Sequence, residues 1–320
     1  MNPRDFDRVA EEAERAVIGG ARSIAILGLT PIALSLVKRL RAFDPSGIGV
    51  AVYDDAGEST PPLSVPVRPF AELRATKPDL IVVASDDDKE RLLDAAFTHV
   101  TGAPRVVLGG YGHLRFRDPV FHETLRGLLV PSLANGYPNT LVHLYQCLVN
   151  AARLDLAGVV AEFGMFRGGT TMFLAQIVAK LGKTWPVIGF DTFAGFPPRR
   201  SMLDMYDHPD CAWHDVDAVR RYLQGERVEI VVGDLVETCK RLATEDVVLS
   251  FVDTDNHTSA SAVLDVIRDR TVLGGAIVLD HFTGTDRFCY TLGERMAARV
   301  LLTDSRYFHL HDTGVFYRQR

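Results

Sequence analysis

The sequence predicts an α/β protein with two Rossmann-like parallel sheets, a smaller one followed by a larger one. Along most of the chain, short apolar runs alternate with segments of helical periodicity, and this order gives parallel sheets with helical crossovers. The alternation is interrupted near residues 112–136 and then resumes. Because 320 residues is also long for one compact domain, we expect one domain over residues 1–120 and a second over residues 121–320.

The first series opens with the apolar run 23-SIAILGL-29, which Thr30 and Pro31 follow directly. Thr is a good N-cap residue and Pro is favoured at the first helical position, so we expect a helix from there to about Phe43. The rest of the series is predicted as strands at 48–55, 79–86 and 104–110, with helices at 69–76 and 88–99.

The first domain departs from the dinucleotide-binding fingerprint. The stretch 27-LGLTPIA-33 keeps one glycine of that pattern, and Pro31 removes an N–H that could meet a phosphate. Asp54 or Asp55 does stand at the end of the second strand, where an acid could bind a ribose. We interpret this domain as a degenerate Rossmann-like unit used for packing, dimerisation or acceptor docking, with NAD binding as the alternative.

The second series opens with an amphipathic helix over 139–152, in which apolar residues recur at i, i+3, i+4 and i+7. Strands are predicted at 158–164, 186–192, 227–234, 247–254 and 275–282, with helices between them that include 170–181 and 258–268. The segment 307–319 is predicted as two short strands about a turn. A βα series closed by such a pair has the strand order of a class I methyltransferase.

A glycine-rich turn follows the first strand of this series, in 161-AEFGMFRGGTT-171. Its glycines would allow backbone to approach a ligand closely, and Glu162 at its entrance would repel a pyrophosphate but attract an ammonium. S-adenosylmethionine (SAM) carries an α-ammonium and no phosphate. The predicted cofactor-binding residues of this turn are Glu162, Gly164, Arg167, Gly168, Gly169 and Thr170. Arg167 could meet the carboxylate of SAM or face water. For the glycine motif as a whole, the alternative is a tight turn that is purely structural and binds no ligand.

Two further acids end the next two strands. Asp191 stands where an acid commonly accepts both ribose hydroxyls, and Asp234 at the level of an adenine amino group. Each aspartate alone is typical of a turn or an N-cap. Three acids at three successive strand ends, after one glycine turn, favour a SAM site.

The runs 160–177, 189–197, 252–267 and 274–282 together resemble the macrocin-type O-methyltransferases, and the resemblance covers about residues 135–320. It implies a SAM-dependent, usually divalent-metal-assisted enzyme that methylates sugar hydroxyls of antibiotics. The element 251-FVDTD-255 is also similar to that of the catechol and caffeoyl-CoA O-methyltransferases. The resemblance places the methionine and ribose parts of SAM at Glu162, Gly164, Gly168 and Asp191, and the adenine at Asp234.

The same resemblance implies that Asp253 is a first metal ligand and Asp280 a second. Where the family usually carries a further acid or an asparagine, this sequence has His281. Imidazole is a competent ligand for softer divalent ions but a poor one for Mg²⁺, so the expected metal is Mg²⁺ or another divalent ion. His281 is therefore either a third ligand or a general base that acts without metal. Asp255 or His281 would receive the proton of the acceptor. The alternative interpretation of residues 253–257 is a polar loop without a catalytic role, in which Asn256 or Thr258 caps the next helix.

The insert 198–217 has mixed charge and little periodicity. It predicts either a mobile lid over the acceptor or a surface loop without a role. The candidate acceptor contacts are His208, Trp213 and His214, with Tyr137 and Thr140 as weaker ones.

Composition and net charge limit the kinds of binding partner that we expect. A net charge of −6 argues against a nucleic-acid or anionic-membrane surface. The four scattered cysteines suit a reducing cytoplasm, and the N-terminal stretch lacks the layout of an export signal. We expect a cytoplasmic enzyme with a small-molecule acceptor that assembles as a homo-oligomer such as a dimer.

The sequence as a whole predicts a SAM-dependent O-methyltransferase acting on a hydroxyl of a small natural product, a sugar or a phenol. One alternative is an NAD-dependent oxidoreductase or nucleotide-sugar enzyme that uses the first domain. Another is a non-catalytic SAM-binding protein in which His281 marks a lost metal site.

Overall fold

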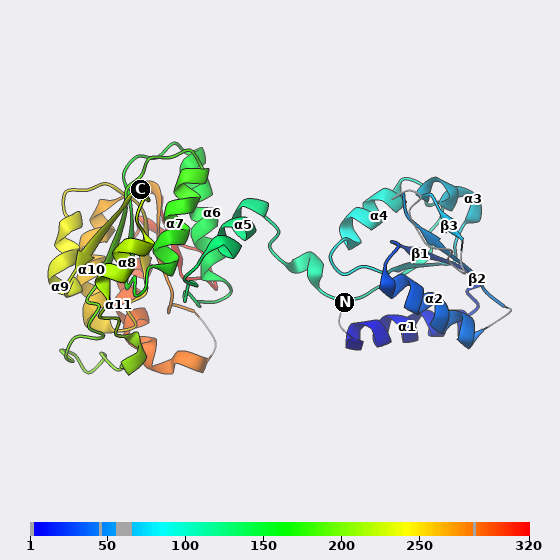
Figure 1. The fold of residues 1–320 in the computed structure, drawn as a ribbon, viewed down its shortest axis with the longest axis horizontal. Helices are drawn as coiled ribbons and strands as arrows, with labels where there is room; N and C mark the ends of the chain where they lie inside the picture. The colour runs from blue at the N-terminus through cyan, green and yellow to red at the C-terminus, as the bar shows by residue number, and fades with distance from the viewer. Residues whose placement is uncertain (1–2, 45–46, 56–65, 284–285) are drawn as a thin grey trace. The chain divides into compact units, whose positions relative to one another are not determined.

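The computed structural model describes residues 3–44, 47–55, 66–283 and 286–320. The chain divides into two compact units, Met1–Phe116 and Arg117–Arg320 (Figure 1). Each unit has its own sheet and its own hydrophobic core.

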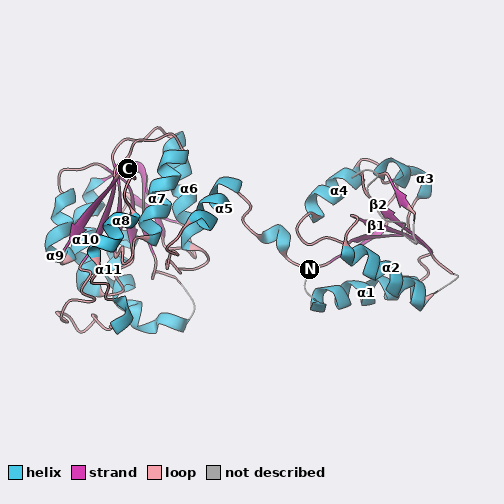
Figure 2. Ribbon diagram, viewed as in Figure 1, coloured by secondary structure: helices cyan, strands magenta, loops and turns pink. Residues whose placement is uncertain are grey.

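The first unit holds a parallel five-stranded sheet in the order β3-β2-β1-β4-β5. Its strands are β1 (Ser23–Leu27), β2 (Gly49–Tyr53), β3 (Val67–Arg68), β4 (Leu80–Val83) and β5 (Arg105–Leu108). Apolar side chains of α1 (Pro3–Ile18) and α2 (Pro31–Phe43) are buried against one face of the sheet. Those of α3 (Leu73–Thr76) and α4 (Lys89–Phe97) cover the other face, so the sheet is sandwiched between helices (Figure 2).

The turn after β1 is closed by groups of the protein itself. Thr30 caps α2 through its side chain and Pro31 is the first helical residue, as the sequence predicts. Asp54, at the end of β2, accepts a hydrogen bond from the backbone N–H of Leu29 at 2.8 Å. A Cβ on Gly28 would lie 2.8 Å from a methyl carbon of Leu92. The acid at the expected ribose position is thus engaged in holding the turn.

The second unit holds a seven-stranded sheet in the order β11-β12-β10-β9-β6-β7-β8. Its strands are β6 (Val159–Phe163), β7 (Val187–Asp191), β8 (Val228–Val232), β9 (Val247–Val252), β10 (Thr271–Leu279), β11 (Tyr307–His309) and β12 (Val315–Arg318). β12 pairs antiparallel with both β10 and β11, whereas β6 to β10 are parallel. This confirms the predicted class I methyltransferase sheet with its closing antiparallel pair.

Helices cover both faces of this larger sheet (Figure 1). The helices are α5 (Pro119–Gly127), α6 (Thr140–Arg153), α7 (Gly169–Lys180), α8 (Val216–Tyr222), α9 (Leu235–Thr238), α10 (His257–Arg270) and α11 (Leu292–Thr303). Side chains of α9, α10 and α11 join the main core cluster with residues of β6, β7, β9, β10 and β12. α5, α6 and α7 pack against one another, and α6 and α7 contact the sheet.

The strand order reverses beside β6, because β6 lies between β7 and β9. In doubly wound sheets such a switch point opens a crevice at the carboxyl ends of the strands, where ligands bind. Glu162, Asp191 and Asp253 all stand at or just beyond the carboxyl ends of these three strands. The fold therefore gathers acids that are far apart in the sequence.

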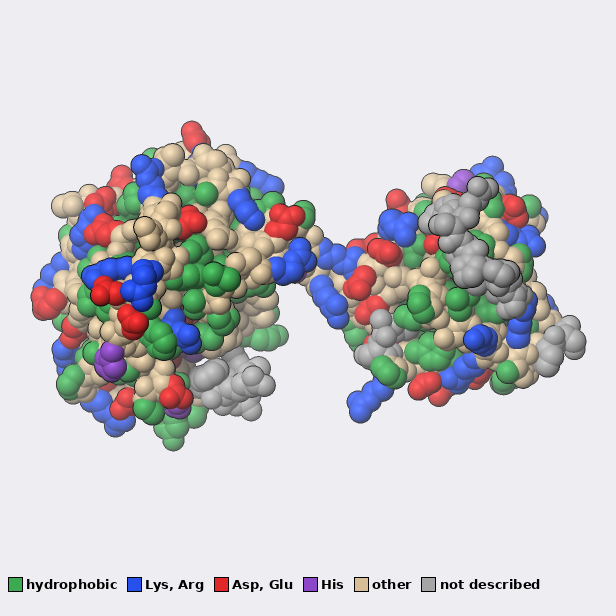
Figure 3. Space-filling model, in the orientation of Figure 1, with side chains coloured by type: hydrophobic (Ala, Val, Ile, Leu, Met, Phe, Trp, Pro, Cys, Tyr) green, Lys and Arg blue, Asp and Glu red, His purple; other side chains and the backbone are tan. Residues whose placement is uncertain are grey.

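On the face shown in Figure 3, the Lys and Arg side chains are intermixed with the Asp and Glu side chains in both units. Within the part of the chain that the structure describes, no helix combines the length and the apolar character needed to span a bilayer.

Candidate active site

A cavity of about 310 Å³ opens at the carboxyl ends of β6, β7, β9 and β10. Its acidic lining comes from Glu162, Asp191, Asp210, Asp253 and Asp255, and His281 lines it as well. The remaining walls come from the segment 130–135, from the glycine turn and from the insert after β7. The cavity thus brings most of the predicted SAM residues together with Asp253 and His281, whereas the predicted residues Gly168, Asp234 and Asp280 are not among the described residues that line it.

The glycine turn fits closely against other parts of the backbone. Gly164 has φ +93°, and a Cβ there would lie 2.0 Å from the carbonyl oxygen of Asp253. A Cβ on Gly169 would lie 2.3 Å from the carbonyl oxygen of Pro131. Gly164 and Gly169 line the cavity, whereas Gly168 packs against side chains of α8 and of Leu223. These glycines therefore allow the walls of the cavity to approach one another.

Glu162 is the most buried acid of the cavity, with 1% of its surface exposed. Its carboxylate accepts a hydrogen bond from the hydroxyl of Thr171, and Thr170 lies beside it and lines the cavity. Burial raises the pKa of Glu162 to about 8, and the nearby Asp191 and Asp280 add to the shift. Because burial disfavours the ionised form of Glu162, a cationic ligand in the cavity would favour ionisation of this carboxyl group and pair with it.

Asp191 holds two turns in place. Its carboxylate accepts a hydrogen bond from the backbone N–H of Phe166 at 2.7 Å and another from that of Phe193 at 2.6 Å. Both phenylalanines have positive φ, of 48° and 57°, so these bonds stabilise backbone that non-glycine residues rarely adopt. Burial raises the pKa of Asp191. Each of its oxygens accepts one of these two bonds and keeps a further lone pair for a ligand hydroxyl.

Asp234 and Arg167 have other partners. Asp234 caps α9 by accepting from the backbone N–H of Val236 at 3.0 Å, and it forms an ion pair with Arg200. Among the described residues that line the cavity, Leu235 is present but Asp234 is not. The role of Asp234 at the adenine stays a prediction. Arg167 lines the cavity, and its guanidinium carbon lies 4.3 Å from the ring centroid of Trp213.

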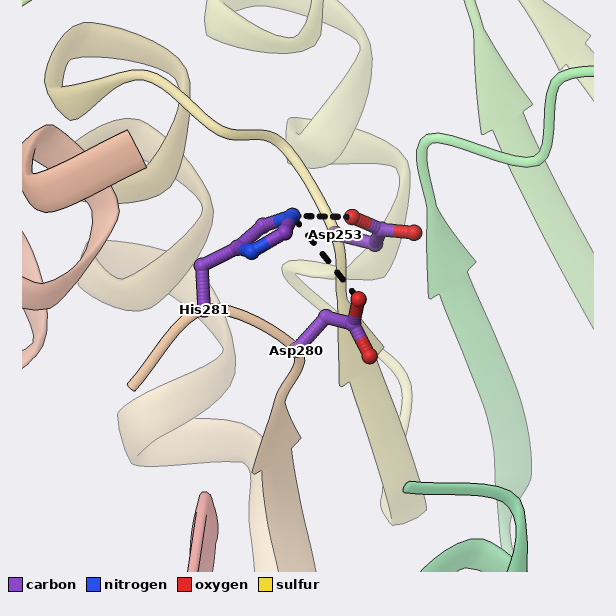
Figure 4. A group of neighbouring side chains, drawn as sticks. All are labelled: Asp253, Asp280 and His281. Carbon is purple, nitrogen blue, oxygen red and sulfur yellow. Dashed lines mark ion pairs between the residues drawn. The ribbon is translucent and has the colours of Figure 1, made fainter. Parts of the chain in front are cut away.

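Asp253, Asp280 and His281 form a compact group (Figure 4). Each offers one ligand atom, and these atoms all lie within 4.8 Å of one another. The Nε2 atom of His281 is 3.3 Å from Asp253, 3.7 Å from Asp280 and 3.0 Å from Asp255, measured to carboxylate oxygens. The two carboxylates and the imidazole of Asp253, Asp280 and His281 are close enough to hold one metal ion.

Burial and the charges within this group shift the pKa values of His281 and Asp253. Burial alone would lower the pKa of His281, but hydrogen bonds to Asp253 and Asp255 raise it to about 12. Burial and the neighbouring Asp280 raise the pKa of Asp253 well above its usual range. Without another cation, the imidazole is therefore protonated at neutral pH.

Asp280 also anchors the segment that precedes α6. Its carboxylate accepts hydrogen bonds from the backbone N–H groups of Asn135, at 3.1 Å, and Gly136, at 2.9 Å. Residues 130–135 form one wall of the cavity. The same carboxylate thus positions this wall and faces the cation group.

A profile of the macrocin O-methyltransferase (TylF) family matches residues 131–319. The chain belongs to the macrocin O-methyltransferase family. It is accordingly a SAM-dependent O-methyltransferase, and residues 1–130 lie outside the match. A search of curated proteins found no match.

The solved structures that are similar to the chain include three methyltransferases. The O-methyltransferase NovP has 19% sequence identity and a TM-score of 0.47, over 56% of this chain and 78% of that chain. The calicheamicin methyltransferase CalS11 has 21% identity and a TM-score of 0.42, over 68% and 98%. The methyltransferase PaMTH1 of Podospora anserina, bound to S-adenosylhomocysteine (SAH), has 14% identity and a TM-score of 0.41, over 64% and 89%.

In this macrocin-type methyltransferase, the insert after β7 is an anchored wall of the cavity. Asp204 accepts hydrogen bonds from the backbone N–H groups of Arg200, Ser201 and Thr258. Asn256 does not cap α10 through its side chain, which instead exchanges two bonds with the backbone of Tyr206, at 2.9 and 2.8 Å. The first half of the insert is therefore fastened to the start of α10.

The insert contributes Tyr206, Asp210 and Cys211 to the cavity, three residues that the sequence did not single out. The five predicted acceptor contacts are not among the described residues that line it: Tyr137, Thr140, His208, Trp213 and His214. Thr140 is buried at the start of α6, and His208 caps the short helix at Pro209–Cys211. Contact of any of the five with an acceptor stays a prediction.

Proposed function

We propose that this methyltransferase transfers the methyl group of SAM to a hydroxyl of a small natural product, a sugar or a phenol, with the help of a divalent cation. The observation that carries the proposal is the shared cavity, in which Glu162 and Asp191 lie beside Asp253, Asp255 and His281. A donor site and an acceptor-activating site are both required for methyl transfer to oxygen. The family match supports the donor and the type of reaction.

On the donor side, we assign the α-ammonium of SAM to Glu162 and the ribose hydroxyls to Asp191. Glu162 is buried and faces the cavity with a raised pKa, so an ammonium at this point would restore its ionised form. The carboxylate of Asp191 is fixed by two backbone donors and can accept from the ribose without reorganising. Arg167 lines the same cavity and is available to the carboxylate of SAM.

On the acceptor side, the side chains that could serve as metal ligands fit a divalent cation. Ligand atoms bound to one such ion lie roughly 3 Å apart, given metal–ligand bonds of about 2.1 Å, and the separations of His281 from Asp253 and Asp280 are of this order. The mixture of carboxylates and imidazole suits Mn²⁺ or a similar ion better than Mg²⁺. The bound ion would act as a Lewis acid that lowers the pKa of the acceptor hydroxyl.

The proton of the acceptor goes to Asp255. His281 is protonated at neutral pH when no other cation is bound and is occupied as a ligand when one is, so it accepts no proton in either state. Asp255 lines the cavity and lies beside the cation group. The alternative of His281 as a metal-free base is therefore disfavoured.

The transfer itself is an in-line displacement at the methyl carbon. The bond from carbon to sulfur breaks as the bond from carbon to the acceptor oxygen forms, and the products are the methyl ether and SAH. The protein contributes mainly by aligning the three atoms and by excluding water. The walls formed by residues 130–135 and by Tyr206 are placed to do this.

The replacement Asp191→Ala tests the donor side. We expect SAM binding to weaken by at least about tenfold, because two charge-assisted hydrogen bonds worth about 1.5–3 kcal/mol each would be lost. Isothermal titration calorimetry measures this directly, and circular dichroism checks that the turns held by Asp191 have kept their fold. Unchanged affinity for SAM in a folded variant would remove Asp191 from the proposed site.

A further inference from the structure

Glu294, near the start of α11, is a fully buried acid with 0% of its surface exposed. Its two carboxylate oxygens reach two different loops. One oxygen accepts from the backbone N–H groups of Thr254, at 2.8 Å, and Asp255, at 2.9 Å. The other accepts from the backbone N–H of His281 at 3.0 Å. One side chain therefore joins the loop after β9 to the loop after β10.

These two loops carry the whole acid and histidine group. Asp253 and Asp255 lie on the first loop, and Asp280 and His281 on the second. Asp255 has φ +58°, a conformation that non-glycine residues rarely adopt, and its N–H is one of the groups that Glu294 holds. The carboxylate thus fixes an unusual backbone angle at a residue of the cavity.

Neighbouring contacts fix the position of Glu294. A Cβ on Gly293 would lie 2.2 Å from the carbonyl oxygen of Leu203, so the first turn of α11 packs tightly against the insert. Arg295 donates a hydrogen bond to the carbonyl oxygen of Phe282, and its guanidinium carbon lies 4.7 Å from the centre of the Phe282 ring. Glu294 and Arg295 together hold both sides of the segment 281–282.

We propose that Glu294 is a positioning residue that sets the spacing between the two loops and thereby the affinity of the site for a divalent cation. This inference rests on the proposed function, since it concerns the cation assigned there. Glu294 reaches the ligands only through the backbone, and it is not among the described residues that line the cavity. A side chain that lies 13 residues beyond His281 in the sequence would then control the geometry of the site.

The test measures binding of Mn²⁺ to the full-length protein by electron paramagnetic resonance, which detects the free ion and needs no acceptor. Glu294→Gln keeps the shape of the side chain but turns an NH₂ group toward backbone N–H donors. Glu294→Asp keeps the charge but is too short to reach both loops. We expect both variants to bind Mn²⁺ at least about tenfold more weakly than the wild type, the usual effect of removing a group that orients metal ligands.

The control is Asp79→Asn. Asp79 also accepts hydrogen bonds from backbone N–H groups, those of Arg22 and Ser23, but it belongs to the first unit and not to the unit that holds the cavity. It is expected to bind Mn²⁺ like the wild type. Calorimetry with SAM runs in parallel, and the affinity of both Glu294 variants for SAM is expected to remain close to that of the wild type.

The outcomes separate the two proposals. Equal Mn²⁺ affinity in the wild type and the Glu294 variants would overturn the role of Glu294, as would an equal loss in the Asp79 control. A wild type that binds SAM but no Mn²⁺ would overturn both the cation and the role of Glu294, and would leave the donor site standing. A wild type that binds neither would refute the proposed function itself.

Discussion

Replacement of Glu162 with glutamine is expected to weaken SAM binding by at least about tenfold, because a charge-assisted hydrogen bond in a buried site contributes about 1.5–3 kcal/mol. Glutamine has the same shape and can still accept from Thr171, so the cavity should be preserved. Calorimetry with SAM gives the affinity. Glu237→Gln, on the exposed side chain that pairs with Lys240, is the control and should bind SAM normally.

The pH dependence of the same affinity gives a second readout. The pKa of Glu162 in the free protein is about 8, so below that pH the carboxyl group must lose its proton before it can pair with the ammonium of SAM. The affinity of the wild type should therefore increase with pH, by up to about tenfold per pH unit, between about pH 6 and about pH 7. The glutamine variant has no proton to lose, and its affinity should be nearly constant over this range.

The stability of the free protein should respond in the opposite direction. Because the pKa of Glu162 is raised in the folded state, its contribution to the free energy of unfolding is present at low pH and is lost as the pH increases through about 8. The glutamine variant should consequently lose less stability than the wild type as the pH rises from 4.5, the ordinary pKa of the group, to about 8, as thermal unfolding would reveal. If the affinity for SAM changed with pH in the same way in the wild type and in the glutamine variant, and the stability did so as well, the assignment of the SAM ammonium to Glu162 would be contradicted.

Replacement of Asp253 with asparagine is expected to reduce methyl transfer by at least about a hundredfold, because a cation at the reacting oxygen contributes several kcal/mol. The affinity for SAM should change little, because the ammonium and ribose contacts are assigned to other residues. Release of SAH in the presence of sugar and phenol acceptors measures the first quantity, and calorimetry the second. Asp265→Asn, on the exposed face of α10, makes the same change of charge away from the cavity and should leave both unchanged.

Chelation separates the two roles that Asp253 could have. If Asp253 holds a cation, exhaustive treatment of the wild type with a chelator should reproduce the loss of activity, and Mn²⁺ should restore it. Full activity after chelation, combined with an inactive Asp253→Asn variant, would show instead that Asp253 acts by holding the His281 imidazolium.

The fold and the convergence of the acids at the strand ends could be predicted from the sequence because they depend on local patterns. Apolar runs with helical segments between them define the parallel strands, and Glu162, Asp191 and Asp253 each follow such a run directly. Since parallel strands end at one edge of a sheet, their positions in the chain are enough to predict that these acids meet. Thr30 and Pro31 at the start of α2 are local signals of the same kind.

The acceptor half could not be predicted in the same way, because it depends on which loops return to the cavity. Tyr206 lines the cavity only because Asn256, fifty residues further along the chain, holds its backbone. Trp213, which the sequence suggested as an acceptor contact, packs beneath Arg167 and is not among the described residues that line the cavity. No spacing within the insert distinguishes these two aromatic residues.

Glu294 was missed for a related reason. In the sequence it is an acid in the first turn of an amphipathic helix, where acids commonly stabilise the helix N-terminus. Only the packing of α11 against the ends of β9 and β10 reveals its three backbone partners. Complete burial is the feature that distinguishes it from an ordinary helix acid, and burial is a tertiary property.

The central claim is that the cavity at the end of β6 receives the positively charged amino-acid part of SAM. The structure of the protein crystallised with SAH tests it most directly, since SAH retains the same α-ammonium. We expect this ammonium to lie within about 3 Å of a carboxylate oxygen of Glu162, at hydrogen-bonding distance, with the ribose hydroxyls on Asp191. An SAH molecule bound elsewhere, or bound with its ammonium facing away from Glu162, would contradict it.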